Sequence, residues 1–174
     1  FLKVGLISWS YAIRLFFFQL GYRFGLVDID AVMRETISIV DGVDREKLEK
    51  VLLGIYETKL KDMLHPEAKK AIAVHKAAGR KGVIVSNNLA ALLTQTVEDW
   101  GVDDVIANEV CYDGDKVVGQ YSKTICYGKG KIARLKDLPY FDQINFAKSY
   151  FYSDSYYDLP LLEFVGYPVA INAD

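Results

Sequence analysis

Residues 65–88 read HPEAKKAIAVHKAAGRKGVIVSNN and join a helix to a short apolar run. Pro66 is favoured at the first position of a helix, here the expected helix Glu67–Ala78. The run Val83–Val85 then ends at the polar residues 86–88. A short apolar run bounded by turn signals predicts a buried strand, and open parallel sheets bind ligands at the carboxyl ends of such strands.

The alternation of helix and strand continues to the end of the chain. The pattern predicts helices over 89–100 and 129–138, strands over 105–107, 149–152 and 168–171, and a hairpin over 110–121 that turns at Asp113-Gly114. Buried strands separated by crossover helices are typical of a parallel sheet. We therefore expect an α/β fold, with a Rossmann-like core in three α/β/α layers over residues 65–174.

Residues 1–64 carry helical patterns and predict a small helical cap domain. Asp44 is an expected N-cap, and the helix after it has an apolar stripe at Leu48, Leu52 and Ile55. The apolar stretch Val4–Leu20 is interrupted by arginine and glutamine, whereas a membrane-spanning helix needs about 20 mostly apolar residues. A buried cap helix is therefore favoured over a membrane-facing surface, and membrane association is not expected.

The composition excludes several classes of protein. The chain has 174 residues, and its 21 Lys and Arg residues against 23 Asp and Glu residues give a net charge of −2. This near-balance excludes a nucleic-acid binder that works by bulk positive charge. Cys111 and Cys126 are too few for a disulfide scaffold, so a reduced, cytoplasmic protein is expected.

The segment Tyr150–Leu162, YFYSDSYYDLPLL, is the strongest candidate for a chemical site. A strand-like run leads to Asp154, and Asp158 follows four residues later at the start of a helical turn. Paired carboxylates suit a hard cation such as Mg²⁺, which prefers oxygen ligands. The structural alternative is that Asp154 caps a helix and Asp158 is only solvated.

Two further positions could handle phosphate. The Ser86 hydroxyl and the backbone N–H groups around Asn87 stand at a strand-to-helix turn, which can hold phosphoryl oxygens. The segment taken alone favours the alternative that Ser86 or Asn88 caps the next helix. The segment 128–131, Gly-Lys-Gly-Lys, opens a helix but is not a Walker loop. Lys131 could reach back to a phosphate held by the hydroxyl and a metal.

These three sites occur in an order that resembles a known family. The segments VIVSNN, GKGKIARL and YSDSYYDLPLLEFVGYPVAIN are similar to motifs of the haloacid dehalogenase-like phosphohydrolases, in the phosphoserine phosphatase-like branch that carries a helical cap. The resemblance covers nearly the whole chain. It matches Ser86 to the second motif, Lys131 to the third, and Asp154 with Asp158 to the acidic fourth motif.

The resemblance implies a Mg²⁺-dependent phosphatase that acts on a small phosphomonoester, phosphoserine-like substrates included, through an aspartyl-phosphate intermediate. Ser86 and Asn87 would hold the substrate's phosphoryl oxygens, and Lys131 would stabilise negative charge. Asp154 and Asp158 would serve the metal, with Asp158 orienting either the metal's waters or Lys131. Ser86, Lys131 and Asp154 are thus the expected catalytic residues.

The first motif of the family, an apolar strand ending in Asp-x-Asp, has no convincing match. The segment GLVDIDAV contains Asp28 and Asp30 but leads straight into a helical pattern, like a cap helix of this branch. The nucleophile and the central strand that carries it are therefore expected upstream of Phe1, and the chain without them is expected to be inactive.

Three questions stay open from the sequence. The chain could be a catalytically silent binding module of the same fold, or a phosphotransferase that uses the same site. The arginines of the cap could meet a substrate carboxylate or phosphate, or could be ordinary surface residues; they are Arg14, Arg23, Arg34 and Arg45.

Overall fold

The computed structural model describes residues 13–14, 16–18, 20–21, 24 and 26–172. The chain forms two compact units, one of residues 1–54 with 109–123 and the other of residues 55–108 with 124–174. The units are defined by packing, and the hairpin of the first unit packs against its helices. The functional division into a cap over 1–64 and a core over 65–174 stays a prediction. The expected cap helix Val4–Leu20 lies largely outside the described residues.

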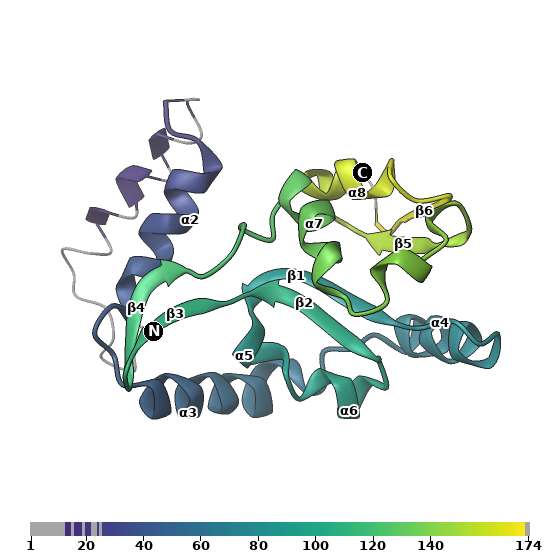
Figure 1. The fold of residues 1–174 in the computed structure, drawn as a ribbon, viewed down its shortest axis with the longest axis horizontal. Coiled ribbons are helices and arrows are strands. Elements are labelled where there is room, and N and C mark those ends of the chain that lie inside the picture. Colours follow the sequence, from purple (N-terminus) through teal and green to yellow (C-terminus); the bar gives the residue numbers. More distant parts are fainter. Residues whose placement is uncertain (1–12, 15, 19, 22–23, 25, 173–174) are drawn as a thin grey trace. The chain divides into compact units, whose positions relative to one another are not determined.

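The first unit combines helices with one antiparallel hairpin (Figure 1). Its described elements are α2 (Ile29–Ile37), the 3₁₀ turn η2 (Ser38–Val40), α3 (Arg45–Ile55, whose last residue falls in the second unit), β3 (Val110–Asp113) and β4 (Lys116–Tyr121). The side chain of Asp28 caps α2 by accepting the Ala31 N–H at 2.7 Å. This helix start agrees with the sequence, which predicted a helix at Asp28 and Asp30.

The hairpin lies close against the helical part of its own unit. The Gly42 N–H donates to the Val117 carbonyl and the Val117 N–H donates to the Val43 carbonyl, both at 2.8 Å. A Cβ at Gly119 would lie 2.8 Å from the Ser38 Cα, so only glycine fits there. These contacts explain why the hairpin, expected at this place in the sequence, belongs to the N-terminal unit.

The second unit is an α/β arrangement. Its described elements are a π-helical turn (Tyr56–Leu60), α4 (Pro66–Ala77), β1 (Val83–Leu89), α5 (Ala90–Leu93), α6 (Thr96–Trp100), β2 (Asp104–Asn108), α7 (Lys129–Arg134), β5 (Tyr150–Ser153), α8 (Leu159–Leu162) and β6 (Tyr167–Ala170). Short 3₁₀ turns are η4 (Leu135–Asp137), η5 (Phe141–Gln143), η6 (Phe146–Lys148) and η7 (Tyr156–Asp158).

One expected helix differs in the structure. The helix over 89–100 is two short helices, α5 and α6, that are interrupted at residues 94–95. The hydroxyls of Thr94 and Thr96 donate to the carbonyls of Ala90 and Leu93, at 3.2 and 2.5 Å. Such local side-chain hydrogen bonds compete with regular helix geometry, which a pattern of apolar residues does not reveal.

The parallel strands that the sequence predicts are present in two pairs. Strand β1 pairs with β2, with Val83 opposite Asp104, and β5 pairs with β6, with Tyr150 opposite Tyr167. The pairs are separate two-stranded sheets, and no strand among the described residues joins them. The expected central strand upstream of Phe1 therefore stays a prediction.

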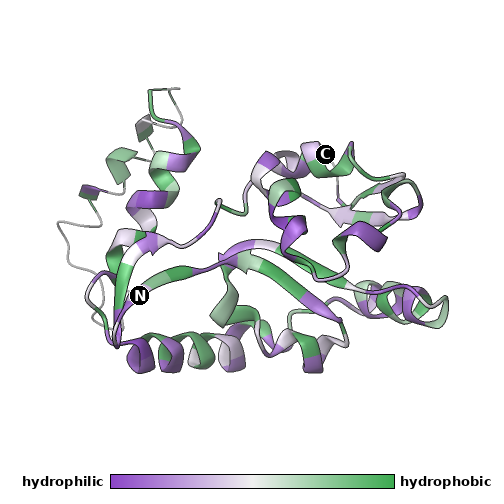
Figure 2. Cartoon of the chain, in the orientation of Figure 1, coloured by the Kyte–Doolittle hydropathy of each residue, from purple (hydrophilic) through white to green (hydrophobic). Residues whose placement is uncertain are grey.

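One apolar core connects both parallel pairs. Its buried members come from β2, α7–η4 and α8 and from the segments beside them: Ile106, Cys126, Leu135, Leu138 and Leu161. Val83 and Val85 of β1 and Phe151 of β5 pack against this cluster. Strand β2 is coloured largely hydrophobic in Figure 2, as expected for a strand that faces the core. Strands β1, β2 and β5 thus pack on one core.

No helix in the described part of the chain is long and apolar enough to cross a membrane.

Candidate active site

The polar residues 86–88, expected to follow the strand, lie within β1 (Val83–Leu89) but leave its regular ladder with β2; they are called the Ser86–Asn88 turn below. Pairing with β2 is regular up to Val85 and shifts before Leu89, so residues 86–88 stand out from the ladder. The Ser86 hydroxyl accepts hydrogen bonds from the backbone N–H and from the side-chain amide of Asn88, both at 3.2 Å. The N-cap of α5 is Leu89 and has no side-chain cap, so Ser86 does not cap that helix.

Lys131 and Asp158 form an ion pair in the second unit. Their Nζ and Oδ1 atoms lie 2.5 Å apart, and the two side chains are only 9% and 10% exposed. The second oxygen of Asp158, Oδ2, accepts the Ser153 hydroxyl at 2.7 Å. Both carboxylate oxygens are therefore occupied, one by an ammonium group and one by a hydroxyl.

Asp154 has a different environment. It follows β5 directly and is exposed, and within the described residues its carboxylate has no hydrogen bond or ion pair. The N-cap of η7 is Ser155 and that of α8 is Asp158, each without a side-chain cap, so Asp154 does not cap either turn. The described residues contain no group of three or more His, Cys, Asp or Glu side chains that could hold a metal ion.

A buried thiol lies among these residues. Burial raises the pKa of Cys126 to about 11, and the positive charges of Lys131 and Arg134 act in the opposite direction. The negative charge of Asp158 also raises this pKa, and a backbone hydrogen bond from Ser86 lowers it. The charges of Lys131 and Asp158, which are far from Cys126 or Ser86 in the sequence, thus act on the same thiol that the Ser86 backbone contacts.

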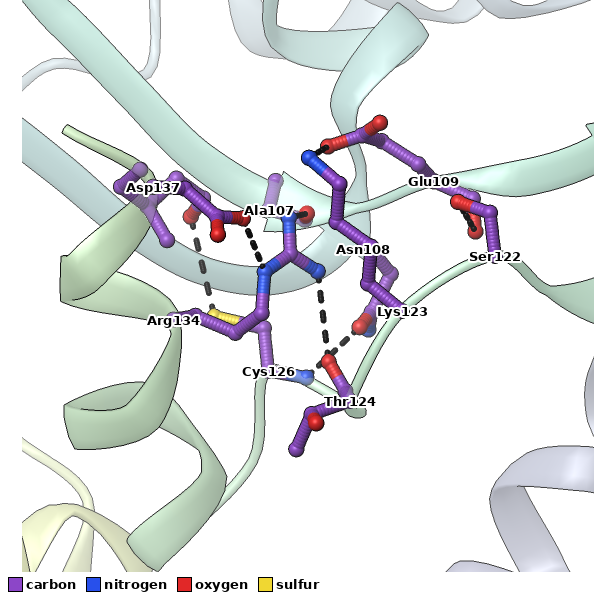
Figure 3. A network of polar contacts seen from close by, with 10 residues as sticks. Ala107, Asn108, Glu109, Ser122, Lys123, Thr124, Cys126, Arg134 and Asp137 are labelled. Atoms are coloured by element: carbon purple, nitrogen blue, oxygen red, sulfur yellow. Dashed lines mark hydrogen bonds and ion pairs between the residues drawn. The ribbon is translucent and has the colours of Figure 1, made fainter. Parts of the chain in front are cut away.

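A second buried cation supports the end of β2 (Figure 3). Arg134 is 3% exposed. Its guanidinium donates to the carbonyls of Ala107 at 2.9 Å and Thr124 at 3.2 Å, and to the carboxylate of Asp137 at 2.7 Å. Because Arg134 and Lys131 lie on the same short helix, these contacts hold α7 against the end of β2.

Close packing at the start of α7 requires glycine. A Cβ at Gly130 would lie 2.0 Å from the Ile125 carbonyl oxygen, and Lys131 is the next residue. We expect Gly130→Ala to lower the free energy of unfolding by about 1–3 kcal/mol, because the helix must move to relieve the clash. Denaturant unfolding measures this loss of stability. Because the movement of the helix displaces Lys131, any activity that depends on Lys131 is also expected to fall.

The matched control is Gly54→Ala in α3, where a Cβ meets no atom within 4 Å. Alanine is favoured over glycine in a helix by about 0.5–1 kcal/mol, so this variant is expected to be slightly more stable than the wild type. A Gly130→Ala variant as stable as the wild type would contradict the packing argument.

Sequence reasoning missed three buried polar residues near the predicted ones: Asn108, Arg134 and Ser153. One signal was available for Asn108. It directly follows the apolar run Val105–Ala107, as Ser86 follows Val83–Val85. Polar residues at the carboxyl ends of neighbouring parallel strands meet at the same edge. Ser153 carries the same signal, because it ends the run before Asp154. Arg134 carries none, because the carbonyls it binds, those of Ala107 and Thr124, lie in other segments.

The chain was compared with known families, proteins and structures. The model of the haloacid dehalogenase-like hydrolase family matches residues 4–163. A histidinol-phosphatase of Neisseria meningitidis is 28% identical over 161 residues, which are 90% of this chain and 72% of the relative. A phosphoserine phosphatase of Mycobacterium tuberculosis is 30% identical over 165 residues, which are 90% of this chain and 51% of the relative.

A solved haloacid dehalogenase family hydrolase of Salmonella enterica serovar Typhi superimposes with a TM-score of 0.71 at 22% sequence identity, covering 92% of this chain and 53% of that one. At this identity the likeness shows the fold, and the α/β, Rossmann-like core expected from the sequence is confirmed. The chain spans between about half and three quarters of the length of these proteins. With a family match over residues 4–163, the chain belongs to the haloacid dehalogenase-like hydrolases.

Proposed function

We propose that this chain forms part of a Mg²⁺-dependent phosphatase for a small phosphomonoester. The observation that carries the proposal is the buried Lys131–Asp158 pair, with the exposed residue Asp154 four positions before Asp158 at the end of β5. An oriented cation and an exposed carboxylate are the groups that a site for a phosphate and its metal ion needs. Relatives named phosphoserine phosphatase and histidinol-phosphatase support a small phosphorylated substrate.

The Ser86–Asn88 turn is proposed to hold phosphoryl oxygens. A hydroxyl can accept two hydrogen bonds and donate one. Asn88 supplies both bonds that Ser86 accepts, so the Ser86 O–H stays available to donate to a phosphate. Asn87 is exposed on the same turn, and its backbone N–H is the proposed second donor.

Lys131 is proposed to stabilise the charge that develops on the phosphoryl group. Its ammonium has three N–H donors, of which the contact with Asp158 uses one. Both oxygens of Asp158 are already bound, which supports its role as the residue that orients Lys131 rather than as a direct metal ligand. This choice selects one of the two roles expected for Asp158 from the sequence.

Asp154 is the proposed protein ligand of Mg²⁺. Its exposed carboxylate, with no partner among the described residues, fits a cation that takes one or two carboxylates and keeps several waters. A bound Mg²⁺ would neutralise the phosphate and so allow an anionic nucleophile to approach it.

The nucleophile is proposed to lie upstream of Phe1. Within the chain, Asp28 is engaged as the N-cap of α2 and Asp30 lies in the first turn of that helix. We propose that an upstream strand supplies the attacking aspartate and joins the parallel pairs of β1 and β5, which no described strand connects. The aspartate would displace the alcohol from phosphorus, and water would then release phosphate.

The N-terminal helices are proposed to act as the cap that selects the substrate. Arg14 pairs with Glu35, and Arg45 pairs with Glu49 at 2.8 Å, so these two arginines have local partners. Arg34 is exposed on α2. Arg23 lies outside the described residues.

Phosphate release tests the proposed function. The full-length protein, incubated with Mg²⁺ and a panel that includes phosphoserine and histidinol phosphate, is expected to release inorganic phosphate and to stop when EDTA removes the metal. Product analysis in the presence of alcohol acceptors separates hydrolysis from phosphotransfer. Binding without turnover across the panel would contradict the enzymatic function and support the silent binding module.

A further inference from the structure

Asn108 is a buried amide whose two functional groups both have partners. It is the last residue of β2 and is 1% exposed. Its Nδ2 donates to the carbonyl of Asn87 at 2.7 Å. Its Oδ1 accepts the backbone N–H of Cys126, also at 2.7 Å. One side chain therefore connects the Ser86–Asn88 turn to the segment that leads into α7.

Cys126, the second partner of Asn108, precedes Lys131 closely in the chain, and backbone hydrogen bonds order the residues around and between them. The Tyr127 N–H donates to the Ile125 carbonyl, the Gly130 N–H to the Tyr127 carbonyl, and the Lys131 N–H to the Gly128 carbonyl. Because these hydrogen bonds fix the backbone between Cys126 and Lys131, a shift of Cys126 is expected to move Lys131 as well. The first partner, Asn87, directly follows Ser86.

An amide suits this place better than any other side chain. The Asn87 carbonyl needs a donor and the Cys126 N–H needs an acceptor, and a primary amide supplies both from one planar group. An alanine would leave a buried carbonyl and a buried N–H without partners, which is costly. Asn108 is almost fully buried, so contact with water does not explain why a polar residue occupies this position.

We propose that Asn108 is a positioning residue for the phosphate site: it fixes the Ser86–Asn88 turn relative to the segment that carries Lys131. The inference rests on the proposed function for its catalytic consequence, because Ser86 and Lys131 are the groups proposed to hold the phosphate. The link that Asn108 makes between these two segments, called the brace below, rests only on its two hydrogen bonds. Displacements of about 1 Å in such sites cost about 100-fold in rate.

Amide hydrogen exchange tests the brace without any need for activity. In the full-length protein, Asn108→Ala is expected to speed exchange at the backbone amides of Asn88 and Cys126 at least tenfold. The matched control is Thr96→Val, which removes another buried hydrogen bond, from a hydroxyl that is 0% exposed. This control is expected to leave the exchange of those two amides at the wild-type rate. Unchanged exchange in Asn108→Ala would overturn the inference.

Phosphatase kinetics test the catalytic consequence. We expect Asn108→Ala to lower kcat/KM about 10- to 100-fold, and Thr96→Val to keep the wild-type value when both are folded. An equal loss of kcat/KM in both variants would mean a general structural effect and would overturn the positioning role. A wild-type protein without phosphatase activity would contradict the proposed function, while faster exchange in Asn108→Ala would still support the brace.

A second variant, Asn108→Asp, keeps the size of the side chain and adds a pH-dependent readout. The ionised carboxylate cannot donate to the Asn87 carbonyl, whereas the protonated form can. Burial favours the neutral form and raises the pKa of such a carboxyl group. We therefore expect kcat/KM relative to the wild type to rise as the pH falls. A ratio that does not change with pH would contradict the role of the Asn108 donor.

Discussion

Replacing Lys131 with methionine is expected to remove nearly all phosphatase activity of the full-length protein and to destabilise its fold. Loss of a donor that stabilises transition-state charge lowers kcat by about 10²–10³-fold. The side chains of Lys131 and Asp158 are 9% and 10% exposed, so the variant leaves a carboxylate buried without its cation. Breaking a buried pair in this way costs about 3–5 kcal/mol of unfolding free energy. Phosphate release and denaturant unfolding measure the two effects.

A double variant separates the two effects of this substitution. Lys131→Met combined with Asp158→Asn removes the unpaired charge, so we expect it to recover part of the lost stability. It does not restore the ammonium group, so activity stays at the level of the single variant. Full activity in a folded Lys131→Met protein would exclude Lys131 from the site.

Replacing Asp154 with asparagine is expected to abolish Mg²⁺-dependent phosphate release while leaving the fold intact. The carboxylate is exposed and has no partner among the described residues, so its removal changes the unfolding free energy by no more than about 0.5 kcal/mol. An amide oxygen is a weaker ligand for Mg²⁺ because it carries no charge. A titration of activity against Mg²⁺ measures the effect.

The matched control for this variant is Asp142→Asn, which removes another exposed carboxylate in η5. It is expected to keep wild-type activity and the wild-type dependence on Mg²⁺. Unchanged activity in Asp154→Asn would remove that residue from the site, whereas an equal loss in both variants would point to a general effect of charge.

The local features of this chain could be predicted from residue order alone. Pro66 begins α4, the expected helix after Asp28 is α2, and the hairpin turn at Gly114-Asp115 lies one residue beyond the expected Asp113-Gly114. The apolar runs at Val83 and Val105 become paired parallel strands. Each of these features depends on residues a few positions apart. The local pattern of capping, turn and apolar residues therefore predicts them.

The contacts that build the candidate site could not be predicted in this way. The position of Lys131 depends on Asp158, which is held in turn by Ser153, and the turn at Ser86 depends on Asn108. Nothing in the sequence distinguishes an Asp158 that binds a metal from one that binds a lysine, because both roles need the same carboxylate. In the folded chain one cation and one hydroxyl meet its two oxygens, which supports the proposed role of Asp158 in orienting Lys131. Residue order thus specified the helices, the strands and the candidate groups, and the tertiary packing determined which groups meet, because the partners are separated by many residues along the chain.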